Sequence, residues 1–169
     1  MRFSKPMPFA VTSSYVENST SLFRYYKQLA DGAIAQVSDE QLITVLDPRM
    51  NSMGVLIHHM AGNMLSRWTD FLSSDGEKPF RDKKAEFGNP PSRRELMTRW
   101  EEAWQCAFAT LGSLTDTDLS KTITIRGEAH SVLQAIGRQI THCAYHVGQM
   151  VLLAKHFAGE EWKPLKVSR

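Results

Sequence analysis

Four long segments of the chain carry apolar residues at helical spacing, and connections rich in Gly, Pro, Asp and Ser separate them. In the first segment, Leu22, Phe23 and Tyr26 fall on one apolar stripe. Capping-box patterns mark the start of a short helix at Ser38 and of a long helix at Ser92. The pattern predicts long helices over residues 11–37, 51–73, 92–111 and 131–157, and a short helix over residues 38–46.

Two of the connections are informative about the fold. Residues 74–91 contain an Asp-Gly pair and two consecutive prolines, which indicates an unusually long loop. Such a loop reaches roughly 50 Å when extended, more than the ~35 Å length of the second helix, so the third helix can run parallel to the second. Residues 121–128 alternate in polarity around Arg126-Gly127, which predicts a short hairpin. We expect one all-α domain over residues 1–169, a four-helix bundle with a long crossover between helices two and three and a short hairpin before helix four.

Composition narrows the partners of this domain. Of the 169 residues, 42% are apolar and 22% are charged, which is typical of one ordinary globular domain. Twenty Lys and Arg against 18 Asp and Glu leave +2 without a block of like charge, so we expect no nucleic-acid partner. No apolar stretch approaches the ~18 residues of a membrane span and no apolar leader follows Met1, so we expect no membrane partner and a cytoplasmic location. We interpret Cys106 and Cys143 as buried thiols.

Two of the six histidines have the spacing of paired metal ligands. His142 and His146 lie one turn apart on the most periodic predicted helix, where both imidazoles can reach one ion. A third ligand must come from the second helix, where His58 and His59 point about 100° apart and cannot both face one site. Their positions relative to the apolar stripe slightly favour His58. In the alternative interpretation, all four histidines are exposed or hydrogen-bonded on solvated helix faces and hold no metal.

Two sequence stretches resemble a known superfamily. They are Asn-Ser-Met-Gly-Val-Leu-Ile-His-His-Met-Ala-Gly-Asn at residues 51–63 and Arg-Gln-Ile-Thr-His-Cys-Ala-Tyr-His-Val-Gly-Gln at residues 138–149. Together with residues 65–72 and 75–78 and with Trp162 in the tail, they resemble, in the same order, the DinB-like (DinB/YfiT-like) superfamily of metal-binding four-helix bundles. The likeness spans nearly the whole chain. More narrowly, the chain resembles a branch of this superfamily that is catalogued as a domain of unknown function.

The resemblance implies an up-down-down-up topology and one divalent metal ion held by three histidines. The first ligand of the superfamily precedes a small apolar residue and Gly-Asn, and this position matches His59. The paired ligands, written His-x-x-x-His before Gly-Gln, match His142 and His146. His58 remains the alternative at the first position. Imidazole binds most late divalent ions, and we expect Zn²⁺ or Ni²⁺.

Three protein ligands leave one coordination position open, as in catalytic rather than structural metal sites. The resembled superfamily includes thiol S-transferases and proteins called hydrolases, so the resemblance implies a metal-dependent enzyme acting on a small molecule, such as a low-molecular-weight thiol. No His-Glu-x-x-His motif occurs, which disfavours a zincin-type peptidase. Two alternatives are a non-catalytic, stress-associated metal-binding bundle and a helical interaction module without metal. The habit of the superfamily also implies a homodimer.

Three polar residues near the expected ligands are candidates for substrate binding. Asn63 and Arg67 lie one and two turns beyond His59, and Gln149 lies three residues beyond the paired histidines. Arg67 is suited to an anionic group of a substrate, while a helix-surface ion pair is the competing interpretation. Each candidate can equally be an ordinary surface residue. We expect Tyr145 to point away from the paired histidines and to be structural.

Overall fold

The computed structural model describes residues 14–166, so the predicted start of the first helix at residue 11 lies outside the described residues. This part of the chain is mostly helical, which confirms the predicted class, and it has one small two-stranded sheet. None of its helices is long and apolar enough to cross a membrane. The long helices are α1 (Tyr15–Ile34), α3 (Met53–Trp68), α5 (Arg93–Ser113) and α6 (Val132–Ala158). The shorter elements are α2 (Asp39–Ile43), α4 (Lys83–Glu86), the 3₁₀ turns η1 (Asp116–Asp118) and η2 (Gly159–Glu161), and the strands β1 (Thr122–Ile125) and β2 (Glu128–Ser131).

Serine side chains start the long helices and α2. The hydroxyl oxygens of Ser14, Ser38, Ser52, Ser92 and Ser131 each accept a hydrogen bond from the backbone N–H three residues further on. All of them except Ser52 also form the reciprocal bond of a capping box. These bonds satisfy amides that the first helical turn leaves unpaired, which is why the predicted starts at Ser38, Ser92 and Ser131 agree with the structure.

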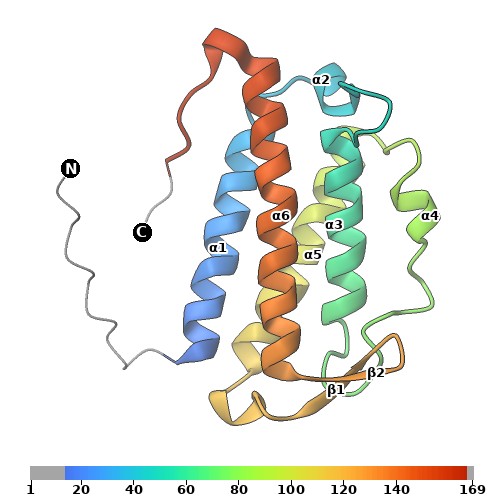
Figure 1. The fold of residues 1–169 in the computed structure, drawn as a ribbon, viewed down its shortest axis with the longest axis vertical. Helices are drawn as coiled ribbons and strands as arrows, with labels where there is room; N and C mark the ends of the chain where they lie inside the picture. Colours follow the sequence, from blue (N-terminus) through green and yellow to red (C-terminus); the bar gives the residue numbers. More distant parts are fainter. Residues whose placement is uncertain (1–13, 167–169) are drawn as a thin grey trace, which may run out of the picture.

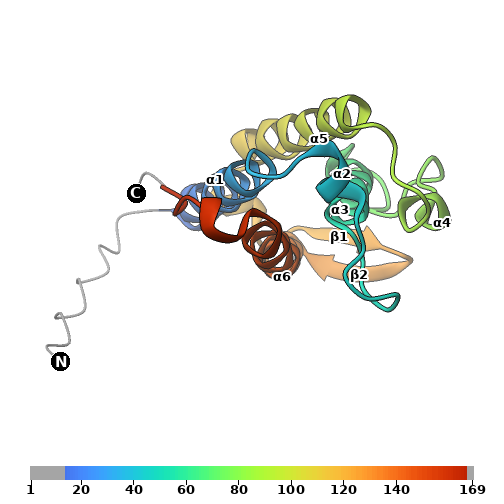
Figure 2. The same cartoon turned by 90° about the horizontal axis from the view of Figure 1, so that it is seen from above.

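The four long helices lie side by side (Figure 1). Followed by colour, α1 and α6 run from the bottom to the top of Figure 1, and α3 and α5 run from top to bottom. The main packing partners are α5 for α3 and α6 for α1, and seen from above the four helices surround a shared centre (Figure 2). Phe23, Trp68, Trp100 and Trp104 fill this centre, and Phe23 meets both Trp68 and Trp104 edge to face.

The predicted hairpin closes the lower end of the bundle in Figure 1. Its strands β1 and β2 are antiparallel, with Thr122 opposite Ser131. Arg126 and Gly127 form the turn with φ angles of 56° and 77°, the left-handed conformation that tight hairpin turns require. The Asp75 carboxylate accepts hydrogen bonds of 2.8 Å from the backbone N–H groups of both turn residues. The hairpin tip is therefore tied to the connection that follows α3.

The predicted long loop between α3 and α5 runs beside α3 and contains the short helix α4 (Figure 1). The buried Ser66 hydroxyl of α3 donates a hydrogen bond to the Gly76 carbonyl (3.0 Å) and accepts one from the Lys78 backbone N–H (2.9 Å). Glu86 of α4 lies so close to Gly62 that a Cβ at that glycine would be 2.2 Å from the Glu86 Oε1. The connection is thus folded against α3, and only glycine allows this approach.

The structure differs from the sequence-based expectation at several helix ends and at one position of the apolar stripe. Helix α1 begins at Tyr15 and ends at Ile34 rather than spanning residues 11–37, and α2 ends at Ile43 rather than at residue 46. Helix α3 ends at Trp68 rather than at the predicted Ser73, because Thr69 is extended and Asp70 has a φ of 46°. Leu22, which the helical pattern placed on the apolar stripe, is 36% exposed. The apolar pattern continues after Trp68 because Phe71 packs in the core from outside the helix.

Candidate metal centre

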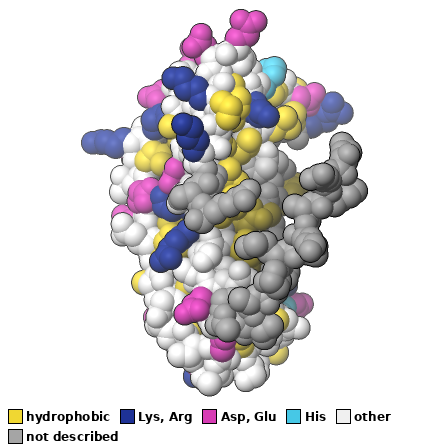
Figure 3. All heavy atoms as spheres, turned by 90° about the vertical axis from the view of Figure 1, so that its left-hand side faces the viewer, with side chains coloured by type: hydrophobic (Ala, Val, Ile, Leu, Met, Phe, Trp, Pro, Cys, Tyr) yellow, Lys and Arg dark blue, Asp and Glu magenta, His cyan; other side chains and the backbone are white. Residues whose placement is uncertain are grey.

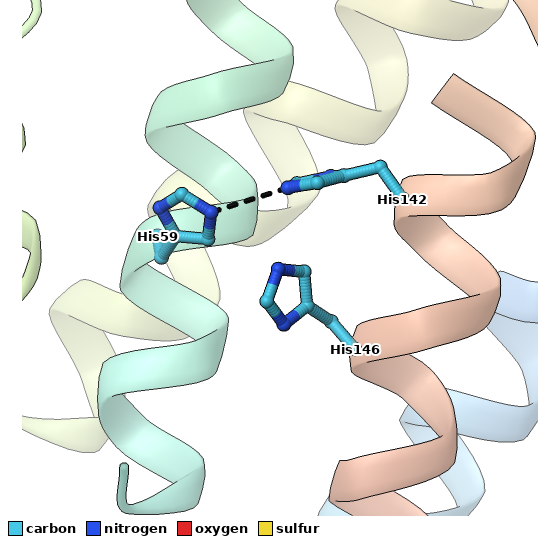
Figure 4. Close-up of side chains that lie close together, drawn as sticks. All are labelled: His59, His142 and His146. Atoms are coloured by element: carbon cyan, nitrogen blue, oxygen red, sulfur yellow. Dashed lines mark hydrogen bonds between the residues drawn. The ribbon is translucent and has the colours of Figure 1, made fainter. Parts of the chain in front are cut away.

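Three histidines from two helices meet at one side of the bundle (Figure 4). His59 projects from α3, and His142 and His146 project from consecutive turns of α6. The Nε2 atoms of His59 and His142 are 3.1 Å apart, and one ring nitrogen of each histidine lies within 4.8 Å of the other two. The ligand nitrogens of a tetrahedral zinc ion, at ~2.0–2.1 Å from the metal, lie about 3.3 Å from one another. The three rings therefore fit a single ion between them.

The surroundings keep two of these rings in the neutral form that binds metals. Burial lowers the pKa of His142 to about 3, and repulsion from His146 and His59 acts in the same direction. Burial also lowers the pKa of His146, against the opposing effect of its hydrogen bond with Gln149. At neutral pH both rings are uncharged, so one nitrogen of each ring carries a free lone pair.

A buried carboxylate orients His59. The Glu86 Oε2 lies 3.0 Å from the His59 Nδ1, and Arg81 donates hydrogen bonds of 2.8 and 2.9 Å to the two Glu86 oxygens. Burial opposes the charge on Glu86, but the hydrogen bonds from Arg81 and His59 outweigh it and lower the pKa of Glu86 to about 2. The ionised carboxylate accepts the Nδ1–H of His59, which leaves its unprotonated Nε2 facing the other two rings. Carboxylates hold metal-ligating histidines in this way.

Glutamine side chains support the two histidines of α6. The Gln149 Oε1 accepts a hydrogen bond of 3.2 Å from the His146 Nδ1–H, so the Nε2 of this ring also remains free. The Gln139 amide nitrogen lies 3.5 Å from the His142 Nδ1. The sequence suggested Gln149 as a substrate-binding residue; it does not line the cavity of the histidines but lines a second cavity, which Tyr145 also lines.

His58 is not part of the cluster, although its helical position slightly favoured it. Its Nδ1 is buried and has no hydrogen-bond partner among the described residues, and burial followed by repulsion from Arg99 of α5 lowers the pKa of the ring. The helical-wheel argument assumes one buried face, but 13 of the 16 residues of α3 are buried. On such a helix the edge of the apolar stripe does not show which histidine faces the site.

The three histidines line a cavity of about 490 Å³, a size that suits a small molecule. Asn63 and Arg67 also line it and are buried, so neither is the ordinary surface residue of the competing interpretation. Tyr145, which we expected to point away from the histidines, lines the cavity although it is 65% exposed. The other lining residues are Arg81, Lys83, Phe87, Arg126, Ala135, Arg138 and Gln139.

Sequence analysis missed the residues that come from the connection and the hairpin. Glu86 and Arg81 lie in the predicted loop, and Arg126 lies at the hairpin turn. One local signal was available, because the Asp82 side chain caps α4 by accepting a hydrogen bond from the backbone N–H of Ala85. That signal predicts a helical turn but not its contact with His59.

Both cysteines are free thiols and lie outside the cavity lining. Burial raises the pKa of Cys143 to about 12, so this thiol is protonated and unreactive at neutral pH. Cys106 is partly buried and lies 3.7 Å from the Thr69 hydroxyl. The prediction of a buried thiol is confirmed for Cys143, and the adjacent His142 does not activate it.

The fold and the site define a helical protein with a three-histidine cluster at a basic cavity. The chain belongs to the family described as "Protein of unknown function (DUF1572)", whose sequence profile matches residues 10–169. It is similar to the crystal structure of a conserved protein from Enterococcus faecalis, with a TM-score of 0.64 and 15% identity over 88% of this chain and 99% of that chain. This likeness shows a shared fold. No curated protein matches the chain.

Proposed function

We propose that this chain is a metal-dependent enzyme of the DinB-like type, an up-down-down-up four-helix bundle in which His59, His142 and His146 hold one Zn²⁺ or Ni²⁺ ion. The observation that carries the proposal is the meeting of three ring nitrogens within 4.8 Å on the wall of a cavity. The opposite directions of α3 and α6 and the long connection before α5 support the topology. The resemblance of residues 51–63 and 138–149 supports the superfamily.

The donor set leaves room for a substrate. Among the described residues, no fourth His, Cys, Asp or Glu joins the group, whereas structural zinc sites normally have four protein ligands. A bound ion with an open position supplies a Lewis acid that lowers the pKa of a coordinated water or thiol. Asn63 and Tyr145 stand on the cavity wall, where they can contact and orient the substrate.

The cavity favours thiol activation over hydrolysis. Activation of water benefits from a general base, but the described lining contains no Asp or Glu, and its three histidines are the metal ligands. A thiol bound by the ion would release its proton to solvent water, and the positive charge of the ion would stabilise the resulting thiolate. We therefore favour transfer of a low-molecular-weight thiol to an electrophilic small molecule.

A second candidate function is metal binding without catalysis. The histidine cluster joins α3 to α6, whereas α3 packs mainly against α5 and α6 packs mainly against α1. An ion at the cluster would thus link the α3–α5 pair to the α1–α6 pair. The contact between α3 and α6 is smaller than the contact within either pair. In this case the ion contributes folding stability, and the cavity beside it has no substrate.

Elemental analysis of protein purified without an affinity tag tests the metal site. We expect about one divalent ion per chain and loss of most of it in His142→Ala and in His146→Ala, because two imidazoles rarely retain an ion alone. His156→Ala is the matched control, since His156 lies on the same helix, is exposed and is outside the cluster. Unchanged metal content in the two cluster variants would overturn the proposal.

A second experiment separates the enzyme from the structural metal protein. Thiols are screened against electrophilic acceptors, and any turnover is followed before and after chelation, together with the melting temperature. Turnover that falls by roughly 100-fold or more on chelation supports the enzyme. A large loss of melting temperature on chelation, without turnover of any thiol or ester, supports the structural role instead.

A further inference from the structure

The cavity beside the histidines is strongly basic. Its described lining has five Lys and Arg side chains and no Asp or Glu: Arg67, Arg81, Lys83, Arg126 and Arg138. The whole chain, in contrast, has a net charge of only +2, and Figure 3 shows acidic and basic side chains interspersed on another face. Positive charge is therefore concentrated at this cavity.

Three of the five cations form ion pairs with two carboxylates outside the lining. Arg81 is paired with Glu86, with 2.8 Å between Nε and Oε1. Lys83 and Arg126 share the Glu77 carboxylate at 2.8 and 3.0 Å. These pairs hold the connection and the hairpin tip together, so the three cations have a structural explanation.

The other two cations, Arg67 and Arg138, form no ion pair in the described part of the chain. Arg67 is only 6% exposed, and its Nη1 has no hydrogen-bond partner among the described residues. Burial, followed by repulsion from Arg138 and Arg126, lowers the pKa of Arg67 to about 10, so the guanidinium is still charged at neutral pH. An unpaired buried charge destabilises a protein. A bound anion would remove this penalty.

The Arg67 side chain is held in position by the elements around it. A Cβ at Gly76 would be 2.7 Å from the Arg67 Nη1, and the Ile125 side chain borders the same space. The backbone around Gly76 is in turn fixed to α3 by Ser66 and to the hairpin tip by Asp75. A guanidinium that is already ordered loses little conformational entropy when it binds an anion.

Arg67 and Arg138 lie at the hairpin end of the cavity, away from the histidines. Arg67 follows His59 by eight residues of α3, which is about 12 Å along the helix at ~1.5 Å per residue. On α6, which runs in the opposite direction, Arg138 precedes His142 by four residues, or about 6 Å. Asn63 lies between the two ends on α3 and also lines the cavity.

We propose that Arg67 and Arg138 bind an anionic group of the substrate, a carboxylate or a phosphate, while the reactive end of the substrate lies at the three histidines. The place of the reactive end rests on the proposed function, but the anion site does not. The substrate then carries its anionic group roughly 6–12 Å from its reactive atom. Guanidinium groups recognise carboxylates and phosphates through paired N–H donors, which makes this chemistry specific.

The anion site is tested by comparing the binding of hexanoate and of hexan-1-ol. The two ligands have the same six-carbon skeleton, but only hexanoate is charged. Calorimetric titration of the full chain as purified is expected to show about tenfold tighter binding of hexanoate, because a charged guanidinium bond is worth at least one order of magnitude. Arg67→Met should remove this preference, and the exposed-site variant Arg138→Gln should reduce it about threefold. Arg94→Gln is the matched control, since Arg94 is exposed and outside the cavity.

Three results would overturn the anion site. They are equal affinities for the two ligands, no detectable binding of hexanoate, and a preference that survives in Arg67→Met. Circular dichroism first shows whether Arg67→Met is folded. If it is not, Arg138→Gln decides, because its side chain is exposed and its replacement does not disturb the core. Hexyl phosphate, titrated in parallel, shows whether a phosphate or a carboxylate is preferred.

The His142→Ala variant separates this proposal from the proposed function. Hexanoate held by the arginines keeps its preference in His142→Ala and loses it in Arg67→Met. Hexanoate that coordinates a metal ion shows the reverse pattern, which contradicts the anion site. If the purified chain holds no ion but the arginine-dependent preference is present, the metal enzyme fails and the anion site stands. If the ion is bound and no preference appears, only the anion site fails.

Discussion

Two neighbouring rows of side chains on α3 are both removed from solvent, apart from the half-buried His59, but differ in chemistry. The rows are Met60, Met64 and Trp68 on one side, and His59, Asn63 and Arg67 on the other. Each row has the four-residue spacing of a helix, and the second is offset from the first by one residue, or about 100°. The first row packs into the core, and the second faces the cavity. Burial alone therefore does not distinguish a core from a site.

The state of the polar groups distinguishes the two rows. In the first row, Trp68 packs against Phe23 and Phe71, and burial of its apolar surface stabilises the fold. In the second row, Arg67 is buried without an ion pair in the described residues, which costs stability. We infer that the first row was selected for folding and that the second is retained for binding.

Removal of the largest side chain of the core row should have the largest effect on stability. We expect Trp68→Ala to lower the free energy of unfolding by about 3–5 kcal/mol, because it leaves a cavity beside Phe23. Asn63→Ala in the cavity row is the matched comparison and should change it by less than about 1 kcal/mol. Urea unfolding of both variants checks the difference, and similar losses in the two would contradict our distinction between the rows.

Replacing the carboxylate behind the cavity row should act on metal affinity. In Glu86→Gln the neutral amide is a poorer acceptor for the His59 Nδ1–H, and we expect metal affinity to fall about 10–100-fold, or up to about 2.7 kcal/mol. Glu77→Gln is the control, because Glu77 also contacts Arg81 but none of the three histidines. Competition with a chelating dye measures both affinities. Equal losses of metal affinity in Glu86→Gln and Glu77→Gln would mean that both carboxylates act only through the folding of the connection.

The neutral histidines of α6, which line the same cavity as this row, should make the metal-free protein sensitive to acid. His142 has a pKa of about 3 in the folded protein and near 6.5 in the unfolded chain, so only the unfolded chain takes up a proton between these values. Its contribution to stability is complete above pH 6.5 and is lost as the pH falls toward 3. We expect a loss of about 2 kcal/mol between pH 7 and pH 5 in urea unfolding with chelator. His142→Ala should flatten this dependence, while His156→Ala should not.

The smallest expected effect is a gain in stability in the cavity row. Arg67→Met keeps much of the side-chain volume and removes the unpaired buried charge, so we expect roughly 1 kcal/mol higher unfolding free energy in the ligand-free protein. Arg67→Lys retains the charge and should show no gain. Chemical unfolding compares the three proteins, and a loss of stability in Arg67→Met would mean that Arg67 serves the fold rather than a ligand.

Local patterns predicted most of the fold. Serine caps at Ser38, Ser92 and Ser131 and the turn at Arg126 and Gly127 depend on hydrogen bonds or backbone angles of residues close in the chain, so sequence analysis found them. The end of α3 at Trp68 was placed too late, because the apolar pattern continues through Phe71, which packs in the core from outside the helix.

The candidate site was only partly predictable. The spacing of His142 and His146 on one helix placed both on the same side, which the structure agrees with. Periodicity slightly favoured His58 over His59, and only the resemblance to the DinB-like superfamily indicated His59. No local pattern connected Glu86 to His59, because 27 residues separate them and their contact depends on how the connection folds back along α3.

The sequence by itself determined the long helices, the caps at Ser38, Ser92 and Ser131, the hairpin turn and the paired histidines, because these features depend on neighbours along the chain. Only the tertiary structure decided that His59 joins His142 and His146, that Arg67 is buried, and that five cations surround one cavity. These features depend on distances between α3, α6, the connection and the hairpin tip. A nearly neutral chain can concentrate charge at one site, since folding brings together residues that are far apart in the sequence.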